Sequence, residues 1–238
     1  MQIYNEKIFD LLNPSIFSIE SALKNGLHLR YRNDCFSVEN LLSFECHSLK
    51  EMIHFIKQGL NNRFVSSSKY NHLSSRSHSI LTITLEAINL LKLNDTMLSN
   101  LHLVDLAGSE RGSTSSHDTK LQKEAIEINK SLFALRQVIL MNIEAQQGKA
   151  VYVPYRDSKL TSILKQSIGG NSYCLMISNM APDAIFFEDN MSTLLYSSKA
   201  SIIRNKPEKN KDPKNVIIDD LNVFIHVETN RRFDQAVR

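Results

Sequence analysis

The spacing of hydrophobic and polar residues along the chain predicts alternating helices and strands. Helical spacing runs from Ser48 to Leu60, with Ser48 as the expected N-cap, and from Lys120 to Asn142. Residues Ile80 to Leu85, "ILTITL", alternate β-branched residues with leucine and predict a strand. The run "LHLVDL", Leu101 to Leu106, is apolar at nearly every position, which is typical of a strand covered on both faces.

The second half of the chain continues this alternation. We expect a helix from Asp157 to Ile168 closed by Gly169 and Gly170, a strand from Tyr173 to Asn179, and an amphipathic helix from Glu188 to Lys199. Residues 1–45 are expected to form a strand, a short helix and a small hairpin. Strands that alternate with helices predict an α/β fold, in which helices cover both faces of a central sheet.

The composition changes near residue 204 and indicates a domain boundary. The stretch "RNKPEKNKDPK" holds five basic residues, two acidic residues and two prolines, and it lacks large apolar side chains. Such a composition is typical of a linker. We therefore predict one domain over residues 1–203 and a linker-like segment over residues 204–238, in which "VIIDDLNVFI" begins a possible helix.

The overall composition narrows the class of protein without naming a function. The chain has 238 residues, of which 42% are hydrophobic and 22% charged, and its net charge is only +3. A charge this small does not call for a nucleic-acid partner. Cys35, Cys46 and Cys174 are scattered and form no C-x-x-C motif, so neither a zinc ribbon nor a disulfide framework is indicated. No apolar run approaches the roughly 18 residues of a membrane span, and residues 1–10 lack a signal peptide's apolar core. We expect an intracellular, soluble protein.

The stretch "DLAGSE", Asp105 to Glu110, is the first candidate for chemistry. Asp105 ends a predicted strand, and ligands of open α/β sheets bind at that edge. Its carboxylate offers the hard oxygen that Mg²⁺ prefers, directly or through water. Gly108 lacks a Cβ, so its backbone N–H can approach a phosphate closely. Alone, this arrangement is weak evidence, because an aspartate followed by a glycine turn often ends a strand.

The stretch "NHLSSRSH", Asn71 to His78, adds complementary groups. Ser74 and Ser75 offer hydroxyls suited to Mg²⁺ or a γ-phosphate, and Arg76 offers a planar cation for the Glu110 carboxylate. Such a pair, closing around a phosphate, would position an attacking water. The competing interpretation is a solvated turn with a surface ion pair, which contributes only about 0–1 kcal/mol. His78 is interpreted as a core or rim histidine rather than a catalytic base.

These stretches resemble the motifs of kinesin motor domains. "NHLSSRSH" is similar to the family's switch I motif, and "DLAGSE" is similar to its switch II motif. Three further stretches agree with the family in order and spacing: "IYNEKIFDLL" at Ile3–Leu12, like a strand-to-helix junction; "EINKSLFAL" at Glu127–Leu135, like the switch II helix; and "VPYRDSKLTSILKQSIGGN" at Val153–Asn171, like the loop and helix that face tubulin. The resemblance covers the chain to about Pro207.

The resemblance implies a fold, an activity and roles for named residues. The fold would be the kinesin-type P-loop NTPase fold with a central mixed sheet, and the activity would be ATP hydrolysis coupled to movement along microtubules, with ATP and Mg²⁺ as cofactors. Ser75 and Asp105 would hold the magnesium shell, Asn71 and Ser74 would lie near the γ-phosphate, Gly108 would sense it, and Arg76 and Glu110 would form a catalytic latch. The residues facing the microtubule would be Lys120, Lys123, Lys130, Arg156 and Lys159.

One part of the expected site has no counterpart in the sequence. The phosphate cradle of P-loop proteins, G-x-x-x-x-G-K-[ST], does not occur in the 238 residues, and the family's N-terminal part is unmatched. Turnover of ATP by this chain alone is therefore not expected. The chain is either a piece of a longer motor or a degenerate relative, and the alternative function is a non-catalytic microtubule- or kinesin-binding module. A small signalling GTPase is excluded because N-K-x-D is absent.

The resemblance leaves the subfamily open. "TSSHD", residues 114–118, is similar to the switch II loop of depolymerising kinesins, whereas residues 202–217 resemble the neck linker of transporting motors, which favours plus-end-directed movement. Ser162 stands where many kinesins carry a basic residue that contacts microtubules. We expect cytoplasmic localisation on the microtubule cytoskeleton and a possible dimer through a downstream coiled coil. We expect no nucleic-acid partner and no membrane span.

Overall fold

The structure is a computed structural model that describes residues 1–13, 26–32, 34–69, 77–88, 96–108 and 119–209. Side chains are described in the same ranges apart from residues 64–69 and 119–129. The chain forms two compact units, and each is described by itself: one comprises Met1–Ile80 and Val104–Pro207, and the other comprises Leu81–Leu103 and Glu208–Arg238.

Four strands form the principal sheet in the order β2-β1-β5-β6. Their bounds are Gln2–Tyr4 (β1), Lys7–Phe9 (β2), His78–Ile88 (β5) and Thr96–Asp105 (β6). Strand β1 pairs antiparallel with β2 and with β5. The terminal ammonium of Met1 donates to the carbonyl oxygen of Ile80 at 2.9 Å, and the Ile80 N–H donates back to Met1 at 2.9 Å. The strand predicted at Ile80–Leu85 is confirmed as part of β5, and the strand predicted at Leu101–Leu106 is confirmed up to Asp105, where β6 ends.

Strands β1 and β2 form a tight hairpin. Asn5 and Glu6 occupy its two turn positions with φ of 51° and 54°, which is the backbone of a two-residue type I′ turn. The expected strand-to-helix junction at Ile3–Leu12 is therefore wrong for these residues. The local alternation of apolar and polar residues on both sides of the turn favours the hairpin, and the turn directs Glu6 away from the ladder.

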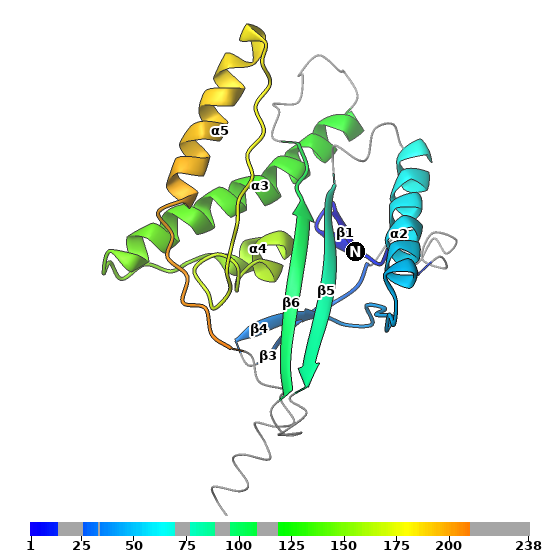
Figure 1. The fold of residues 1–238 in the computed structure, drawn as a ribbon. Helices are drawn as coiled ribbons and strands as arrows, with labels where there is room; N and C mark the ends of the chain where they lie inside the picture. Colours follow the sequence, from blue (N-terminus) through cyan, green and yellow to red (C-terminus); the bar gives the residue numbers. More distant parts are fainter. Residues whose placement is uncertain (14–25, 33, 70–76, 89–95, 109–118, 210–238) are drawn as a thin grey trace, which may run out of the picture. The chain divides into compact units, whose positions relative to one another are not determined.

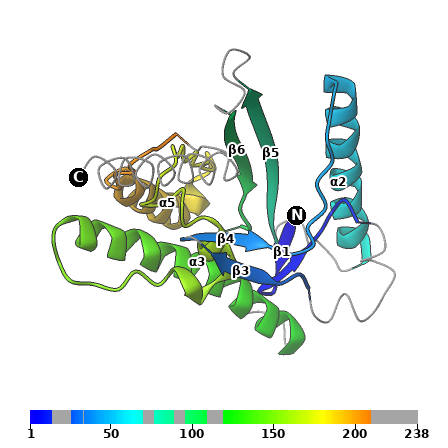
Figure 2. The same cartoon turned by 90° about the horizontal axis from the view of Figure 1, so that it is seen from below.

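A second hairpin confirms the one expected near the N-terminus. Strands β3 (Leu29–Arg32) and β4 (Cys35–Val38) form a separate two-stranded sheet, drawn in Figure 2, and β4 contacts α4. Asp34 in its turn has a φ of 61°. The short helix expected in this region has no counterpart among the described residues up to Glu45.

Helices account for most of the remaining structure. They are α2 (Leu49–Lys69), α3 (Thr119–Gln146), α4 (Lys159–Ile163) and α5 (Phe187–Ala200), with 3₁₀ turns η3 (Tyr155–Asp157) and η4 (Ala184–Phe186). Three of the predicted helices are confirmed, α2, α3 and α5. The Ser48 hydroxyl accepts a hydrogen bond from the Glu51 N–H at 3.2 Å, as an N-cap does. No described helix is long and apolar enough to cross a membrane.

The helix predicted at Asp157–Ile168 is wrong in its extent. Ser158 has an extended backbone, with φ −143° and ψ 150°, and separates η3 from α4. Its hydroxyl accepts from the Leu160 N–H at 3.1 Å, so the N-cap lies inside the predicted helix. Turns replace the helix after Ile163. Gly169 has a φ of +81°, and a Cβ there would lie 2.1 Å from the Asn142 side-chain oxygen, so both backbone and space require glycine.

The core lies where α3 and α4 pack on the first strands. Figure 1 shows α4 lying along α3, with α5 on the same helix further on. The buried apolar cluster consists of Ile3, Ile8, Ile80, Leu135, Ile139, Leu160 and Leu164. These residues come from β1, β2, β5, α3 and the α4 region, so one core joins elements from both ends of the first unit.

The strand predicted at Tyr173–Asn179 is wrong in the described structure. The segment belongs to no sheet, and Tyr173, Leu175 and Ile177 are 91%, 85% and 76% exposed. A strand needs a neighbour to pair its backbone groups, and no described segment pairs with this one.

Strand β6 is less covered than its sequence predicts. Leu101 and Leu103 are about half exposed within the second unit, so the expectation that both faces of this strand are covered is not met.

Candidate functional site

Asp105 lies at the carboxyl end of β6 and forms an ion pair with an arginine from α2. The Asp105 Oδ2 atom is 2.7 Å from Nη1 of Arg63, and the same Nη1 donates to the Ser79 hydroxyl at 2.9 Å. The Arg63 side chain is only 13% exposed, whereas that of Asp105 is 67% exposed. The guanidinium thus joins α2 to the start of β5 and the end of β6, while the carboxylate remains open to solvent.

The Asp105 carboxylate fits a magnesium ion that keeps most of its water. Mg²⁺ in nucleotide sites is held through one or two carboxylates and the phosphates of the nucleotide rather than by a cage of protein ligands. Within the part of the chain that the structure describes, no group of three or more His, Cys, Asp and Glu residues surrounds a common point. Asp105 supplies one such carboxylate, and Arg63 competes for the same oxygen.

The other predicted nucleotide residues fall into two groups. Gly108 is described and half-buried, three residues beyond Asp105 in the turn that follows β6. Asn71, Ser74, Ser75, Arg76 and Glu110 lie outside the described residues. The structure therefore brings Asp105 and Gly108 to one strand end, and the latch between Arg76 and Glu110 stays a prediction.

His78 is buried where β5 begins and uses both ring nitrogens. Its Nδ1 atom accepts a hydrogen bond from the backbone N–H of Ala107 at 2.9 Å, and its Nε2 atom lies 2.8 Å from the Ser131 hydroxyl oxygen. Burial lowers the pKa of His78 to about 4, against an opposing effect of the Asp105 charge. The arrangement agrees with the interpretation of His78 as a core histidine, because both nitrogens are occupied.

The lowered pKa of His78 predicts that acid destabilises the fold. The unfolded chain takes up a proton near the ordinary histidine pKa of about 6.5, whereas the folded chain takes it up only near 4, so stability is present above the unfolded value and is lost as the pH falls. Between about pH 7 and pH 5 the free energy of unfolding should fall by about 2 kcal/mol from this group. Urea unfolding at both pH values measures the fall, which should be about 2 kcal/mol smaller in His78→Asn, since this variant has no titrating ring at position 78. His102, whose pKa is also lowered by burial, contributes equally in both proteins.

Arg63 is a candidate site residue that the sequence interpretation did not include. It lies within α2, the helix that leads into the polar stretch beginning at Asn71. The sequence feature that could have identified Arg63 is a basic residue in a helix directly before a hydroxyl-rich stretch. This feature is weak evidence for a site, because most such side chains lie on a solvated helix face.

The cations expected to face a microtubule lie on α3 and on the η3–α4 segment. Lys120 and Lys123 lie in the first turns of α3, where side chains are not described, and Lys130 is exposed further along the same helix. Arg156 is exposed in η3, and Lys159 begins α4. Because α4 packs against α3, both groups belong to one packed body.

Ser162 occupies a buried position in α4. Its side chain is 4% exposed, and its hydroxyl donates to the carbonyl oxygen of Tyr155 at 2.8 Å. The residue therefore holds η3 against α4. A contact with an external partner is not available to it.

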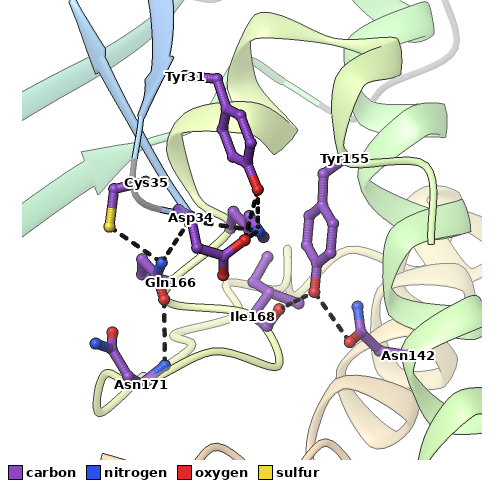
Figure 3. Close-up of polar contacts among 9 residues, drawn as sticks. Tyr31, Asp34, Cys35, Asn142, Tyr155, Gln166, Ile168 and Asn171 are labelled. Carbon is purple, nitrogen blue, oxygen red and sulfur yellow. Dashed lines mark hydrogen bonds and ion pairs between the residues drawn. The ribbon is translucent and has the colours of Figure 1, made fainter. Parts of the chain in front are cut away.

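A polar cluster fastens the β3–β4 hairpin to the segment after α4 (Figure 3). The Asp34 carboxylate accepts from the ammonium of Lys165 and from the Tyr31 hydroxyl, the latter at 2.5 Å. These two hydrogen bonds, that of Lys165 first, lower the pKa of Asp34. The guanidinium of Arg156 lies 4.9 Å from the centre of the Tyr31 ring, within the range of a cation–π contact. The cluster thus holds Arg156 beside the hairpin.

A second set of contacts in Figure 3 fixes the turn that ends in Gly169. The Tyr155 hydroxyl lies 2.7 Å from the carbonyl oxygen of Ile168 and 3.0 Å from the side-chain oxygen of Asn142. Gln166 donates from its amide to the Asp34 carbonyl oxygen at 2.9 Å. The hairpin, η3 and the post-α4 turn are therefore held in one arrangement by side chains from four elements.

Comparison with known proteins assigns the fold to a family. The profile "Kinesin motor domain" matches residues 1–203. The chain is 39% identical over 221 residues to the kinesin-like protein KIN-12E of Arabidopsis thaliana, covering 92% of this chain, and 38% identical over 214 residues to Klp68D of Drosophila melanogaster, covering 90%. The chain belongs to the kinesin motor domain family.

Solved structures give the same result for the fold. A fast kinesin matches 90% of this chain with a TM-score of 0.77 and 37% identity, and a KIF14 dimer bound with AMP-PNP to a microtubule matches 92% with a TM-score of 0.75 and 33% identity. The predicted α/β fold of kinesin type is confirmed. The match spans 17% of KIN-12E, 26% of Klp68D, 57% of the fast kinesin chain and 61% of the KIF14 chain.

Proposed function

We propose that this chain supplies the switch-bearing and microtubule-binding part of an ATP-driven microtubule motor. The observation that carries the proposal is the kinesin motor domain match over residues 1–203, which includes both candidate sites. The relatives are named as kinesin-like proteins, and one matched structure holds AMP-PNP and a microtubule. The proposed cofactors are ATP and Mg²⁺, and the proposed location is the cytoplasmic microtubule cytoskeleton.

The strand-end geometry supports the nucleotide part of the proposal. Asp105 offers an exposed carboxylate at the end of β6, and Gly108 follows in the same turn. An ion at Asp105 would compete with Arg63 for the carboxylate, because Arg63 Nη1 lies 2.7 Å from Oδ2. In this proposal Ser75 completes the magnesium shell, Asn71 and Ser74 contact the γ-phosphate, and Arg76 and Glu110 close around the attacking water.

The cations carried by α3 and by the η3–α4 segment support the microtubule part. A cationic surface speeds encounter with an acidic partner and fixes its register. Arg156 is both exposed and held in place by the ring of Tyr31, so little side-chain entropy is lost on binding. Lys120, Lys123, Lys130 and Lys159 are the further contacts in the proposal.

The exposed apolar segment supports the proposal that further strands of the motor fold belong beside this chain. Tyr173, Leu175 and Ile177 expose most of their surface, and the matched structures contain additional chain outside the matched part. Contiguous exposed apolar side chains of this kind mark surfaces that are covered in the working protein. We place the motor-domain part at residues 1–203 and a neck-linker-like segment at 204–238, which would lead to dimerisation through a coiled coil.

Microtubule pelleting tests the proposal on the chain itself. The 238-residue chain should bind microtubules, and binding should weaken as salt rises, because screening reduces the attraction of exposed charges. The double variant Arg156→Gln and Lys159→Gln should raise the dissociation constant about tenfold, since two exposed ion pairs contribute up to about 1 kcal/mol each. The control variant Lys50→Gln and Lys57→Gln removes the same charge from α2 and should bind like the parent chain. Equal weakening by both variants, or no binding by the parent, would contradict the proposal.

A second candidate function is a microtubule-binding module without catalysis. It is favoured by one observation, that the 238 residues hold no G-x-x-x-x-G-K-[ST] cradle. Microtubule-stimulated ATP hydrolysis decides between the two. Hydrolysis that appears when a P-loop-bearing kinesin segment is joined upstream supports the motor, whereas binding without hydrolysis in that joined protein supports the module.

A further inference from the structure

The His78 ring spans two structural elements that belong to the two halves of the proposed site. One nitrogen contacts the backbone of Ala107 in the turn after β6, and the other contacts the side chain of Ser131 on α3. His78, Ala107 and Ser131 are each no more than 4% exposed. The imidazole is therefore a short rigid link between the turn and the helix, shielded from water at both ends.

The hydrogen bonds determine which nitrogen carries the proton. A backbone N–H is always a donor, so Nδ1, which faces the Ala107 N–H, must be the unprotonated acceptor. A neutral ring then carries its proton on Nε2 and donates it to the Ser131 oxygen. Burial favours the neutral ring as well, since it lowers the pKa of His78 to about 4. An apolar side chain of similar volume would fill the same space but would specify neither contact.

The two ends of this link lie beside residues with proposed roles. Ala107 stands between Asp105, the proposed magnesium residue, and Gly108, the proposed γ-phosphate sensor. Ser131 follows Lys130, a proposed microtubule contact, on α3. A shift of the turn by a fraction of the hydrogen-bond length would break the Ala107 contact or carry the ring with it, and the ring is bonded to the helix.

We propose that His78 is a positioning residue that couples the Leu106–Gly108 turn to helix α3 through its two hydrogen bonds. The functional meaning of the coupling rests on the proposed motor function, in which the turn responds to nucleotide and the helix faces the microtubule. The coupling itself is a property of the described residues. It is measured without nucleotide and without microtubules.

Amide hydrogen exchange on the 238-residue chain tests the coupling. Ser131→Ala removes the helix-side partner of His78, and it should speed exchange of the Ala107 amide about tenfold, as expected when a supporting hydrogen bond is lost. It should also shift the ¹⁵N resonances of the His78 ring. Ser197→Ala is the matched control, since this serine on α5 makes its own hydroxyl contact, to Ser178, away from the link. The control should leave the Ala107 amide unchanged.

A second pair of variants separates coupling from a role in packing alone. His78→Asn places an amide oxygen near the position of Nδ1 and does not reach Ser131, so it keeps the Ala107 contact and cuts the link. In that background Ser131→Ala should add no further acceleration at Ala107, because the two changes act through one bond. The proposal is overturned if Ser131→Ala leaves the exchange rate of the Ala107 amide unchanged. It is also overturned if Ser131→Ala accelerates this exchange equally in the parent chain and in His78→Asn. Failure to pellet with microtubules would overturn the proposed function and leave this result intact.

Discussion

Replacing Leu160 with alanine is expected to lower the free energy of unfolding by about 3 kcal/mol, which is typical of a fully buried leucine. Leu160 has no exposed surface and lies in the cluster that joins α4 to Ile3, Ile8 and Ile139. Removing its side chain leaves a cavity at the point where the N-terminal hairpin, α3 and α4 meet. Because α4 has only five residues, it has little stability apart from this contact.

The chain offers a matched control for this substitution in Leu175→Ala. Leu175 is 85% exposed, so the same chemical change there removes almost no buried surface. Urea unfolding should give a loss near 3 kcal/mol for the first variant and within about 0.5 kcal/mol of the parent for the second. Similar losses in both variants would show that the segment at Leu175 is packed in solution, contrary to the structure. In a joined protein that supplies further strands, we expect Leu175→Ala to become destabilising as well.

The sequence correctly predicts the helices whose own residues carry clear helical signals, such as an N-cap or an apolar stripe. Helix α2 has a serine N-cap and sustained helical spacing, and α3 has a long apolar stripe, so both are confirmed. The segment Tyr173–Asn179 has an equally clear strand pattern. A strand, however, is completed only by a neighbour, and that neighbour is not specified by the segment's own residues.

The helix at Asp157–Ile168 fails for a different reason. Its residues have adequate helical propensity, but Ser158 finds a better partner in Glu6, more than 150 positions earlier in the chain. The Glu6 carboxylate accepts a hydrogen bond from the Ser158 hydroxyl, and the extended serine caps α4. Long-range contacts of this kind override local propensity and leave no periodic signal in the sequence.

The sequence predicts the motifs of the candidate nucleotide site, but it does not predict which side chains contact one another there. The D-x-x-G pattern correctly places Asp105 at a strand end, since a strand followed by glycine is a local signal. The partner of Asp105 among the described residues is Arg63, which lies in α2, and no spacing rule relates residues 63 and 105. No spacing rule relates Ser131 to His78 either, because their hydrogen bond depends on how α3 packs against β5.

Replacing Glu6 with alanine is expected to cost about 3 kcal/mol of unfolding free energy, because two hydrogen bonds to a charged group are lost at about 1.5 kcal/mol each. Glu6 accepts from the Ser158 hydroxyl at 2.8 Å and from the backbone N–H of Lys159 at 2.7 Å. The Lys159 N–H is one of the unpaired donors at the start of α4, and a carboxylate there also suits the helix dipole. The positive φ of Glu6 does not complicate the comparison, since both glutamate and alanine carry a Cβ.

Glu6→Gln removes the charge and one of the two acceptor oxygens at this position. Glutamine keeps the length and one acceptor oxygen, so it can hold one of the two contacts, and we expect about half of the alanine loss. The two variants also predict a functional difference, because Glu6 fixes the first residue of α4, the proposed microtubule contact Lys159. Glu6→Ala should weaken microtubule pelleting more than Glu6→Gln at a temperature where both remain folded. If the two variants unfold at the same urea concentration as the parent, the hairpin turn does not hold α4, and the positioning of Lys159 does not depend on Glu6.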